Sequence, residues 1–337
     1  MKRRIIQIAR LTASLFICIS AAQAQDLHFT QDLENPLLVN PAMLGHNENF
    51  EVMGNYRDQW GMISQGFTTE SFTVLMPLYL KPDNWKSDAG KSKLDFGVNV
   101  ISDKAGAYTT LNAGLSVGYT LRITSSQFLS AALMGNYVQG AYDLTGQTFD
   151  EQYMWGSFNA SNPTGESTLN QKNSYMDAGF GFMWHYMPTN GKVLAYSGFS
   201  VYHVNQPDIS YIQNGTAILP TRFSYQLGLK FIGENKLDFS PILIFSRQGT
   251  INQLISGLLA AYHVGESSQI VLGAWYIGDE AIGAQAGFDH KNFTVMYSYD
   301  FGISDYNLAV SGLTTNEITL AFKINMAAKK GFSTPSF

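Results

Sequence analysis

The stretch from Tyr108 to Arg122, Y-T-T-L-N-A-G-L-S-V-G-Y-T-L-R, alternates between apolar side chains and small or polar ones. A period of two places successive side chains on opposite faces of a β-strand. The stretch also exceeds the about five or six residues of an ordinary strand in a globular protein. A long strand with one apolar face is typical of transmembrane β-barrels, whose strands need roughly 9–11 residues to cross a bilayer.

The same alternation recurs along the chain, most clearly at 174–187, 219–231 and 293–302. An even number of strands is usual in single-chain bacterial barrels. We therefore predict an all-β fold, a transmembrane antiparallel β-barrel of about 14 strands that spans residues 50–325. The predicted strands are 50–57, 67–79, 93–102, 108–122, 127–141, 174–187, 192–203, 219–231, 237–247, 252–263, 269–277, 282–290, 293–302 and 315–325.

The composition agrees with a barrel rather than a helical membrane protein. Only 14% of the 337 residues are charged, and 31 are glycines. Beyond residue 24, no run approaches the roughly 18 consecutive apolar residues of a membrane-spanning helix. The alternative is a soluble β-sandwich or propeller, which usually has shorter strands and fewer surface aromatics.

Residues 1–24 have the features of a secretory signal peptide, with a basic start, a short apolar core and an A-x-A site at Ala22–Ala24. We expect cleavage after Ala24 and location in the outer membrane. Cys18 is the only cysteine and lies within this segment, where the bulky Ile17 before it disfavours lipidation. Removing the four basic residues of the segment leaves 17 against 26 acidic ones, so we expect no nucleic-acid partner.

Residues 25–49 form a lead-in without alternation, and residues 326–337 form a tail beyond the last predicted strand. Asn35-Pro36 and Asn40-Pro41 disfavour helix and indicate turns or extended chain. Two predicted strands, 127–141 and 252–263, are partly apolar on both faces. Their inward faces should therefore contact a dry segment, either the lead-in or loop 142–173, with a hydrophobic ligand pocket as the less favoured alternative.

The predicted loops alternate in length as expected for a barrel with short periplasmic turns and longer external loops. The long external loop 142–173 has an unusual aromatic content. These aromatics either fold inward as a plug or form a partner-contact surface, because large aromatics dominate binding interfaces. They are Tyr142, Phe149, Tyr153, Trp155 and Phe158. Tyr and Trp residues near strand ends suggest interfacial girdles. They are Tyr79, Tyr186, Tyr202, Tyr262 and Trp275.

The chain contains no pattern that indicates catalysis. The six histidines lack metal-ligand spacing, and no G-x-S-x-G motif is present. We predict no enzyme activity, no catalytic residues, no cofactor and no metal.

Several motifs together resemble the PorP/SprF family of outer-membrane proteins of the Bacteroidetes type IX secretion and gliding-motility systems. The opening Q-x-x-x-F-x-Q-x-x-x-N-P-x-x-x-N-P-A contains Asn35, Pro36, Asn40 and Pro41. Y-R-D-Q-W, at 56–60, is similar to the family's Y-R-x-Q-W and contains Tyr56, Arg57 and Trp60. S-D-K-A-G at 102–106 and Y-S-Y-D at 297–300 are weaker matches, and the tail 326–337 departs from a barrel that ends at its last strand.

The resemblance implies an outer-membrane secretion component without catalysis. Its expected partners are the C-terminal domain of a secreted protein or adhesin, other secretion-system subunits including periplasmic ring proteins and lipoproteins, and outer-membrane lipids. Two alternatives remain open. Fatty-acid transporters of the outer membrane also have fourteen strands and an N-P-A motif in their N-terminal hatch, although the predicted polar lumen disfavours an apolar substrate. A diffusion pore would need an unobstructed lumen.

Overall fold

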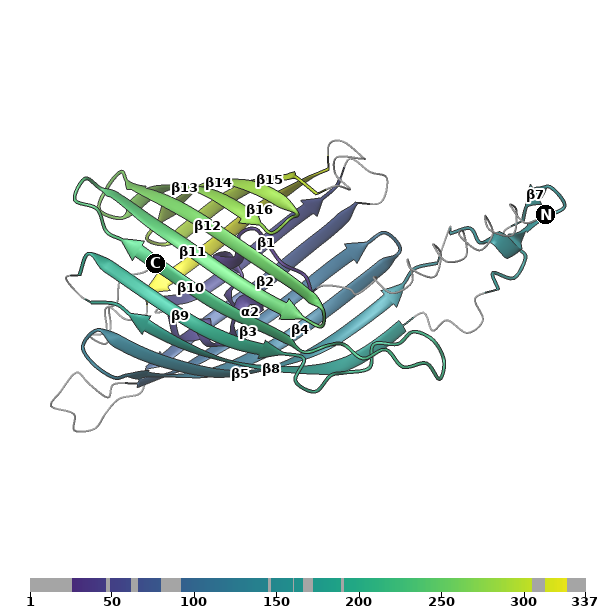
Figure 1. Ribbon diagram of the computed structural model, residues 1–337, viewed down its shortest axis with the longest axis horizontal. Helices are drawn as coiled ribbons and strands as arrows, with labels where there is room; N and C mark the ends of the chain where they lie inside the picture. Colours follow the sequence, from purple (N-terminus) through teal and green to yellow (C-terminus); the bar gives the residue numbers. More distant parts are fainter. Residues whose placement is uncertain are drawn as a thin grey trace, which may run out of the picture.

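The computed structural model describes residues 26–46, 49–61, 66–79, 92–144, 147–159, 161–165, 172–188, 191–304 and 313–325. Within these ranges, fourteen long strands form a closed antiparallel barrel (Figure 1). The strands are β1 (Asn49–Gln59), β2 (Phe67–Tyr79), β3 (Ser92–Ala105), β4 (Tyr108–Arg122), β5 (Gln127–Tyr142), β8 (Lys172–Tyr186), β9 (Val193–Tyr202), β10 (Arg222–Phe231), β11 (Leu237–Gln248), β12 (Ile251–His263), β13 (Ser268–Ile277), β14 (Ala281–His290), β15 (Phe293–Gly302) and β16 (Thr314–Asn325). Pairing of β1 with β16, from Asn49↔Asn325 to Gln59↔Thr315, closes the sheet.

The predicted barrel is confirmed, and each predicted strand bound lies within three residues of the observed one. The largest differences are at β3, which continues to Ala105, and at β10, which begins at Arg222. The predicted signal peptide 1–24 and tail 326–337 lie outside the described residues, as do residue 25 and most of the turn 80–92. No helix among the described residues is long and apolar enough to cross a membrane.

The two faces of the strands differ as the alternation predicts. On β4, Leu115 is 55% exposed on the outer face, whereas the neighbouring Ser116 is fully buried in the lumen. Polar side chains elsewhere in the lumen are buried too, including Gln226 and Glu317. Polar groups that are both inward-facing and buried indicate that something fills the barrel.

The lead-in fills it. Three short helical turns, η1 (Asp32–Glu34), α2 (Pro36–Val39) and η2 (Pro41–His46), lie inside the barrel (Figure 1). The expectation of turns or extended chain at the Asn-Pro steps was therefore wrong for the prolines, each of which begins a helical turn. Proline suits a first helical position, because its fixed φ fits and its missing N–H is not needed there.

Apolar side chains of the lead-in form one buried cluster with the barrel wall. Leu37 and Leu44 are 1% exposed and belong to the same cluster as Ala132 of β5 and Ile255 of β12. This contact explains why β5 and β12 are apolar on both faces, and it confirms the lead-in as the dry segment against them.

The predicted girdle was wrong at three of its five positions, whereas Tyr186 and Tyr262 lie on the outward phase of β8 and β12. Tyr79, Tyr202 and Trp275 are 7%, 2% and 3% exposed and face the lumen rather than the lipid. Trp275 Nε1 donates to Gln285 Oε1 at 2.7 Å, and its ring lies directly over Gly257. Lumen-facing aromatics replace water with packing, which a plugged barrel needs and an open pore does not.

Candidate functional site

The lead-in runs through the lumen from one end of the barrel to the other. Asp26 lies beside Arg222, at the end where the long loops emerge. His46 stacks on His185 near the end of β8, at the end with short turns, with ring centroids 5.2 Å apart. We call these the long-loop end and the short-turn end; in outer-membrane barrels the short turns face the periplasm.

Arg57 of the Y-R-D-Q-W motif holds the first part of the lead-in. Its guanidinium pairs with Glu317 of β16 (Nε to Oε1, 3.1 Å) and donates to the backbone carbonyl of His28 at 2.6 Å. Glu317 in turn accepts from the backbone N–H groups of Thr30 (2.8 Å) and Gln31 (3.0 Å). A buried ion pair therefore connects the β1–β16 seam to the backbone of the lead-in.

The two motif asparagines fix the second part. Asn40 is fully buried, and its Nδ2 donates to Gln226 Oε1 at 2.8 Å while its Oδ1 accepts from the N–H of Ala42 at 2.8 Å. Asn35 Oδ1 accepts from the hydroxyl of Ser71 at 2.9 Å. Pro36 and Pro41, which follow them, are buried at the starts of α2 and η2. The N-P motifs thus serve as polar attachments to the barrel wall.

A cluster of charges holds the lead-in at the long-loop end. His203 lies between Asp26 (2.6 Å) and Asp177 (2.9 Å), and Arg222 Nε is 3.3 Å from Asp26. Burial alone disfavours charge at these sites. At His203, however, the hydrogen bonds to Asp177 and Asp26 raise the pKa to about 9, and at Asp26 the neighbouring Arg222 and His203 lower the carboxyl pKa well below its usual value.

The loop 203–221 covers part of this mouth. Tyr211 descends from it onto the ends of β4 and β5, where its hydroxyl donates to Tyr108 at 3.1 Å and its ring centroid lies 4.9 Å from that of Tyr142. Gly140 makes this contact sterically feasible, since a Cβ there would lie 1.8 Å from the Tyr211 hydroxyl. Tyr142, predicted as a partner-contact residue, is therefore a rim residue in a tyrosine cluster.

The described residues 147–159 and 161–165 of the predicted aromatic loop form an arm that extends away from the barrel (Figure 1). It contains the turn η3 (Asp150–Gln152) and a hairpin of β6 (Tyr153–Met154) and β7 (Ser157–Phe158). The hairpin turns at Trp155 and Gly156, with φ of 57° and 81°. Tyr153, Trp155 and Phe158 are 61%, 97% and 43% exposed, so these aromatics do not enter the lumen as a plug.

The arm has its own internal bonds. The buried Gln152 accepts from the N–H of Phe149 (3.1 Å) and donates to the carbonyl of Asn162 (3.0 Å). Phe149, which directly precedes η3, is half-buried. The bonds of Gln152 therefore order the chain on both sides of the hairpin that carries the exposed aromatics.

The remaining motif residues have separate positions. Tyr56 is 44% exposed on the outer face of β1. Trp60 follows β1 with φ of 59°, and its ring packs edge-on against Phe67 at 5.2 Å. Within the motif, Tyr56 therefore faces the lipid, Arg57 faces the lumen, and Trp60 packs against the start of β2.

Sequence reasoning missed the partners of the lead-in on distant strands, notably Glu317, Arg222 and Gln226. The alternation of each strand places these residues on its lumen face. Nothing in the sequence, however, pairs them with residues 180 to 290 positions away. No group of three or more His, Cys, Asp or Glu residues suited to a metal occurs among the described residues.

Comparisons with known proteins address the family and the fold. A family model described as "Type IX secretion system membrane protein PorP/SprF" matches residues 21–322. The Pseudomonas putida toluene transporter TodX is 10% identical with a TM-score of 0.53, over 89% of this chain and 95% of that one. A deltaS2 mutant of the TodX monoaromatic hydrocarbon channel gives 10% identity and a TM-score of 0.52, over 87% and 94%. No curated protein sequence matches the chain.

Proposed function

The chain belongs to the PorP/SprF family of type IX secretion system membrane proteins, and from this premise we propose that it anchors a secreted protein or adhesin at the cell surface. The outer-membrane barrel is the fixed part of the anchor. The aromatic arm between β5 and β8 is the part that grips the partner. The predicted signal peptide, cleaved after Ala24, would direct the chain to this membrane.

The exposed aromatic tip of the arm is the observation that supports this proposal. Trp155 is 97% exposed, although tryptophan side chains are on average largely buried and exposed apolar patches often mark interaction sites. The arm extends away from the strand ends, so the lipid that covers Leu115 or Leu133 on the barrel wall does not cover this tip. Tyr and Trp are the residues most enriched at the energetic centres of protein interfaces.

The filled lumen supports anchoring rather than conduction. The lead-in is bonded to β1, β2, β8, β9, β10 and β16 by hydrogen bonds from or to Arg57, Ser71, Phe182, Ser200, Gln226 and Glu317. The short-turn end would face the periplasm, where other secretion-system subunits, including ring proteins and lipoproteins, are the expected partners.

The test is a triple variant at the tip, Tyr153→Ser with Trp155→Ser and Phe158→Ser, expressed in the native host. We expect normal barrel assembly, measured by the heat-modifiable shift on electrophoresis, and release of the secreted partner into the medium. Ile212→Ser is the matched control, since Ile212 is 60% exposed on the other long loop. Retention of the partner by the triple variant would contradict the proposal.

A hydrophobic-substrate transporter or a diffusion pore is the alternative function. Either needs a continuous path past the lead-in, whose contacts on both sides of the lumen argue against one. Single-channel recordings and uptake of a labelled fatty acid into liposomes test this alternative; stable conductance or saturable uptake would favour it.

A further inference from the structure

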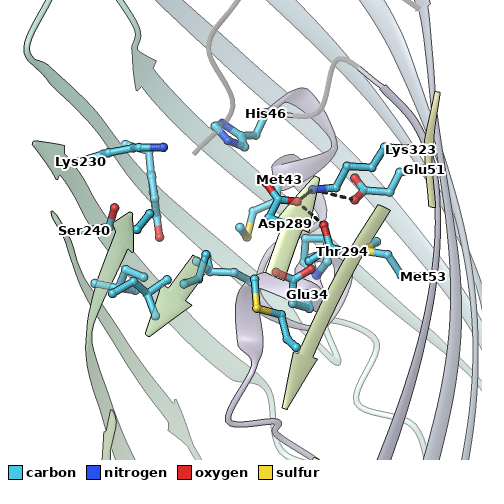
Figure 2. A pocket seen from close by; sticks show the side chains of 18 of the residues that line it. Glu34, Met43, His46, Glu51, Met53, Lys230, Ser240, Asp289, Thr294 and Lys323 are labelled. Atoms are coloured by element: carbon cyan, nitrogen blue, oxygen red, sulfur yellow. Dashed lines mark hydrogen bonds and ion pairs between the residues drawn. The ribbon is translucent and has the colours of Figure 1, made fainter. Parts of the chain in front are cut away.

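A cavity of about 260 Å³ lies between the lead-in and the short-turn end of the barrel (Figure 2). Leu33, Pro36 and Met43 of the lead-in form one wall, and the inward faces of the strands form the others. Of the charged residues that line it, Glu51, Lys230, Asp289 and Lys323 lie close to the short-turn ends of their strands, and Glu34 belongs to the lead-in. The cavity therefore has an apolar depth and a charged rim.

The apolar part is unusually rich in methionine. Met43, Met53, Met183 and Met296 all line it, together with Ile242 and Val271. Methionine has an unbranched, polarisable side chain that adapts to flexible apolar shapes, and it is common at binding surfaces for varied hydrophobic partners. Water takes up about 30 Å³ per molecule, so the cavity has room for about nine non-hydrogen atoms, which is the size of the alkyl part of a medium-chain amphiphile whose head group lies at the rim.

The rim places a cation on each side of the cavity. Lys323 Nζ is 2.9 Å from Asp289 and 4.0 Å from Glu51, so carboxylates already neutralise it. Lys230 projects toward the cavity from the opposite wall, with Nζ 3.8 Å from Asp238 Oδ2 (Figure 2). An ammonium has three N–H donors, so Lys230 can donate to a ligand oxygen in addition to its protein contacts.

We propose that this cavity binds a single-chain amphiphile, a medium-chain carboxylate whose alkyl chain lies against the methionines and whose head group meets Lys230. Glu34, which also lines the cavity, lies near Lys323, Glu51 and Asp289. Burial and the nearby Glu51 and Asp289 raise the pKa of Glu34 to about 7, so its carboxyl is protonated in part at neutral pH and repels a bound carboxylate less than an ionised one would. A cationic head would instead be repelled by Lys230.

The proposal is tested with radiolabelled decanoate and decanol on the full-length protein in amphipol, which avoids competition from free detergent. We expect one saturable decanoate site per chain. Ala261→Phe, which fills the cavity, should abolish binding of both probes. Lys230→Met should weaken decanoate by about tenfold and leave decanol within about twofold, because only the carboxylate forms the charge-assisted bond.

Matched controls separate the cavity from the barrel surface. Ala286→Phe makes the same change on the lipid-facing side of β14, and Lys192→Met removes an exposed lysine at the same end of the barrel. Neither should alter binding. Absence of a saturable site, or equal binding by Ala261→Phe and Ala286→Phe, would overturn the site. Loss of decanoate and decanol to the same degree in Lys230→Met would overturn the anionic head group.

Discussion

At the scale of single residues, the Arg57–Glu317 pair is a buried attachment of the lead-in to the barrel wall. Both side chains are buried, and both also bond the backbone of the lead-in. Removing one partner of a buried ion pair leaves an uncompensated charge and costs about 3–5 kcal/mol. Arg57→Met and Glu317→Met should each lower the free energy of unfolding, measured by urea denaturation, by an amount of this order.

The double variant tests whether that cost arises from the pair. Arg57→Met with Glu317→Met removes both charges of the pair together, so its loss of stability should be smaller than the sum of the two single losses. Additive losses would show that the two side chains act independently.

Gly257 is a second residue whose identity is dictated by one contact. A Cβ at this position would lie 2.4 Å from the Trp275 ring, too close for the ring to remain over β12. Gly257→Ala should therefore displace Trp275 from Gln285 and destabilise the barrel by about 1–3 kcal/mol, as overpacking does. Gly135→Ala is the control, since nothing lies within 4 Å of its added Cβ; equal thermal midpoints for the two variants would contradict the steric argument.

At the scale of elements, the attachment of the lead-in should depend on pH. The pKa of His203 is raised from 6.5 to about 9 in the folded state, so its stabilising effect is complete below pH 6.5 and is lost as pH rises toward 9. Burial raises the pKa values of Asp32 and Glu34 to about 7, so docking of the lead-in also weakens as pH rises from about 4 to 7. In both pH ranges, the stability of the docked lead-in therefore falls as pH rises.

Thermal midpoints measured from pH 5 to pH 10 should therefore fall steadily for the native protein. His203→Gln should flatten the upper part of this curve, and Glu34→Gln the lower part. A His203→Gln curve parallel to that of the native protein above pH 6.5 would refute the assignment to His203.

The strands could be predicted from the sequence, whereas the contacts that the lead-in makes inside the barrel could not. Alternation is a local signal, visible in successive residues such as Leu115 and Ser116. Hydrogen bonding between neighbouring strands then fixes the barrel. The bonds of Asn40 to Gln226 and of Arg57 to Glu317 join residues 186 and 260 positions apart, which no local pattern encodes. The girdle error at Trp275 has the same origin, since an aromatic near a strand end suits the lipid interface and a filled lumen equally.

The aromatic arm was predicted only in part. The concentration of aromatics in loop 142–173 was visible, but the distinction between a plug and an exposed surface depends on where the loop goes. Because the lead-in already occupies the lumen from the long-loop end, the exposed Trp155 and Phe158 do not serve as its plug. The lead-in inside the barrel thus leaves the aromatics of loop 142–173 on the outside.

At the scale of the whole molecule, the barrel is a closed wall with polar inward positions, and the lead-in is its filling. Serine, asparagine and glutamine in the lumen would line a water-filled channel if the lead-in were absent. The wall itself depends on pairing between adjacent strands and on the β1–β16 seam, so its closure does not require the lead-in.

Deletion of residues 26–46 should therefore convert a closed barrel into a conducting one. In planar bilayers we expect stable single-channel steps for the deletion variant and none for the native protein, because water and ions would replace the helical turns η1 to η2. The triple-serine arm variant is the control, since it alters the exterior and leaves the lumen filled. A silent deletion variant that retains its heat-modifiable mobility would show that the wall closes the lumen by itself, and steps in the native protein would show that the lead-in does not seal it.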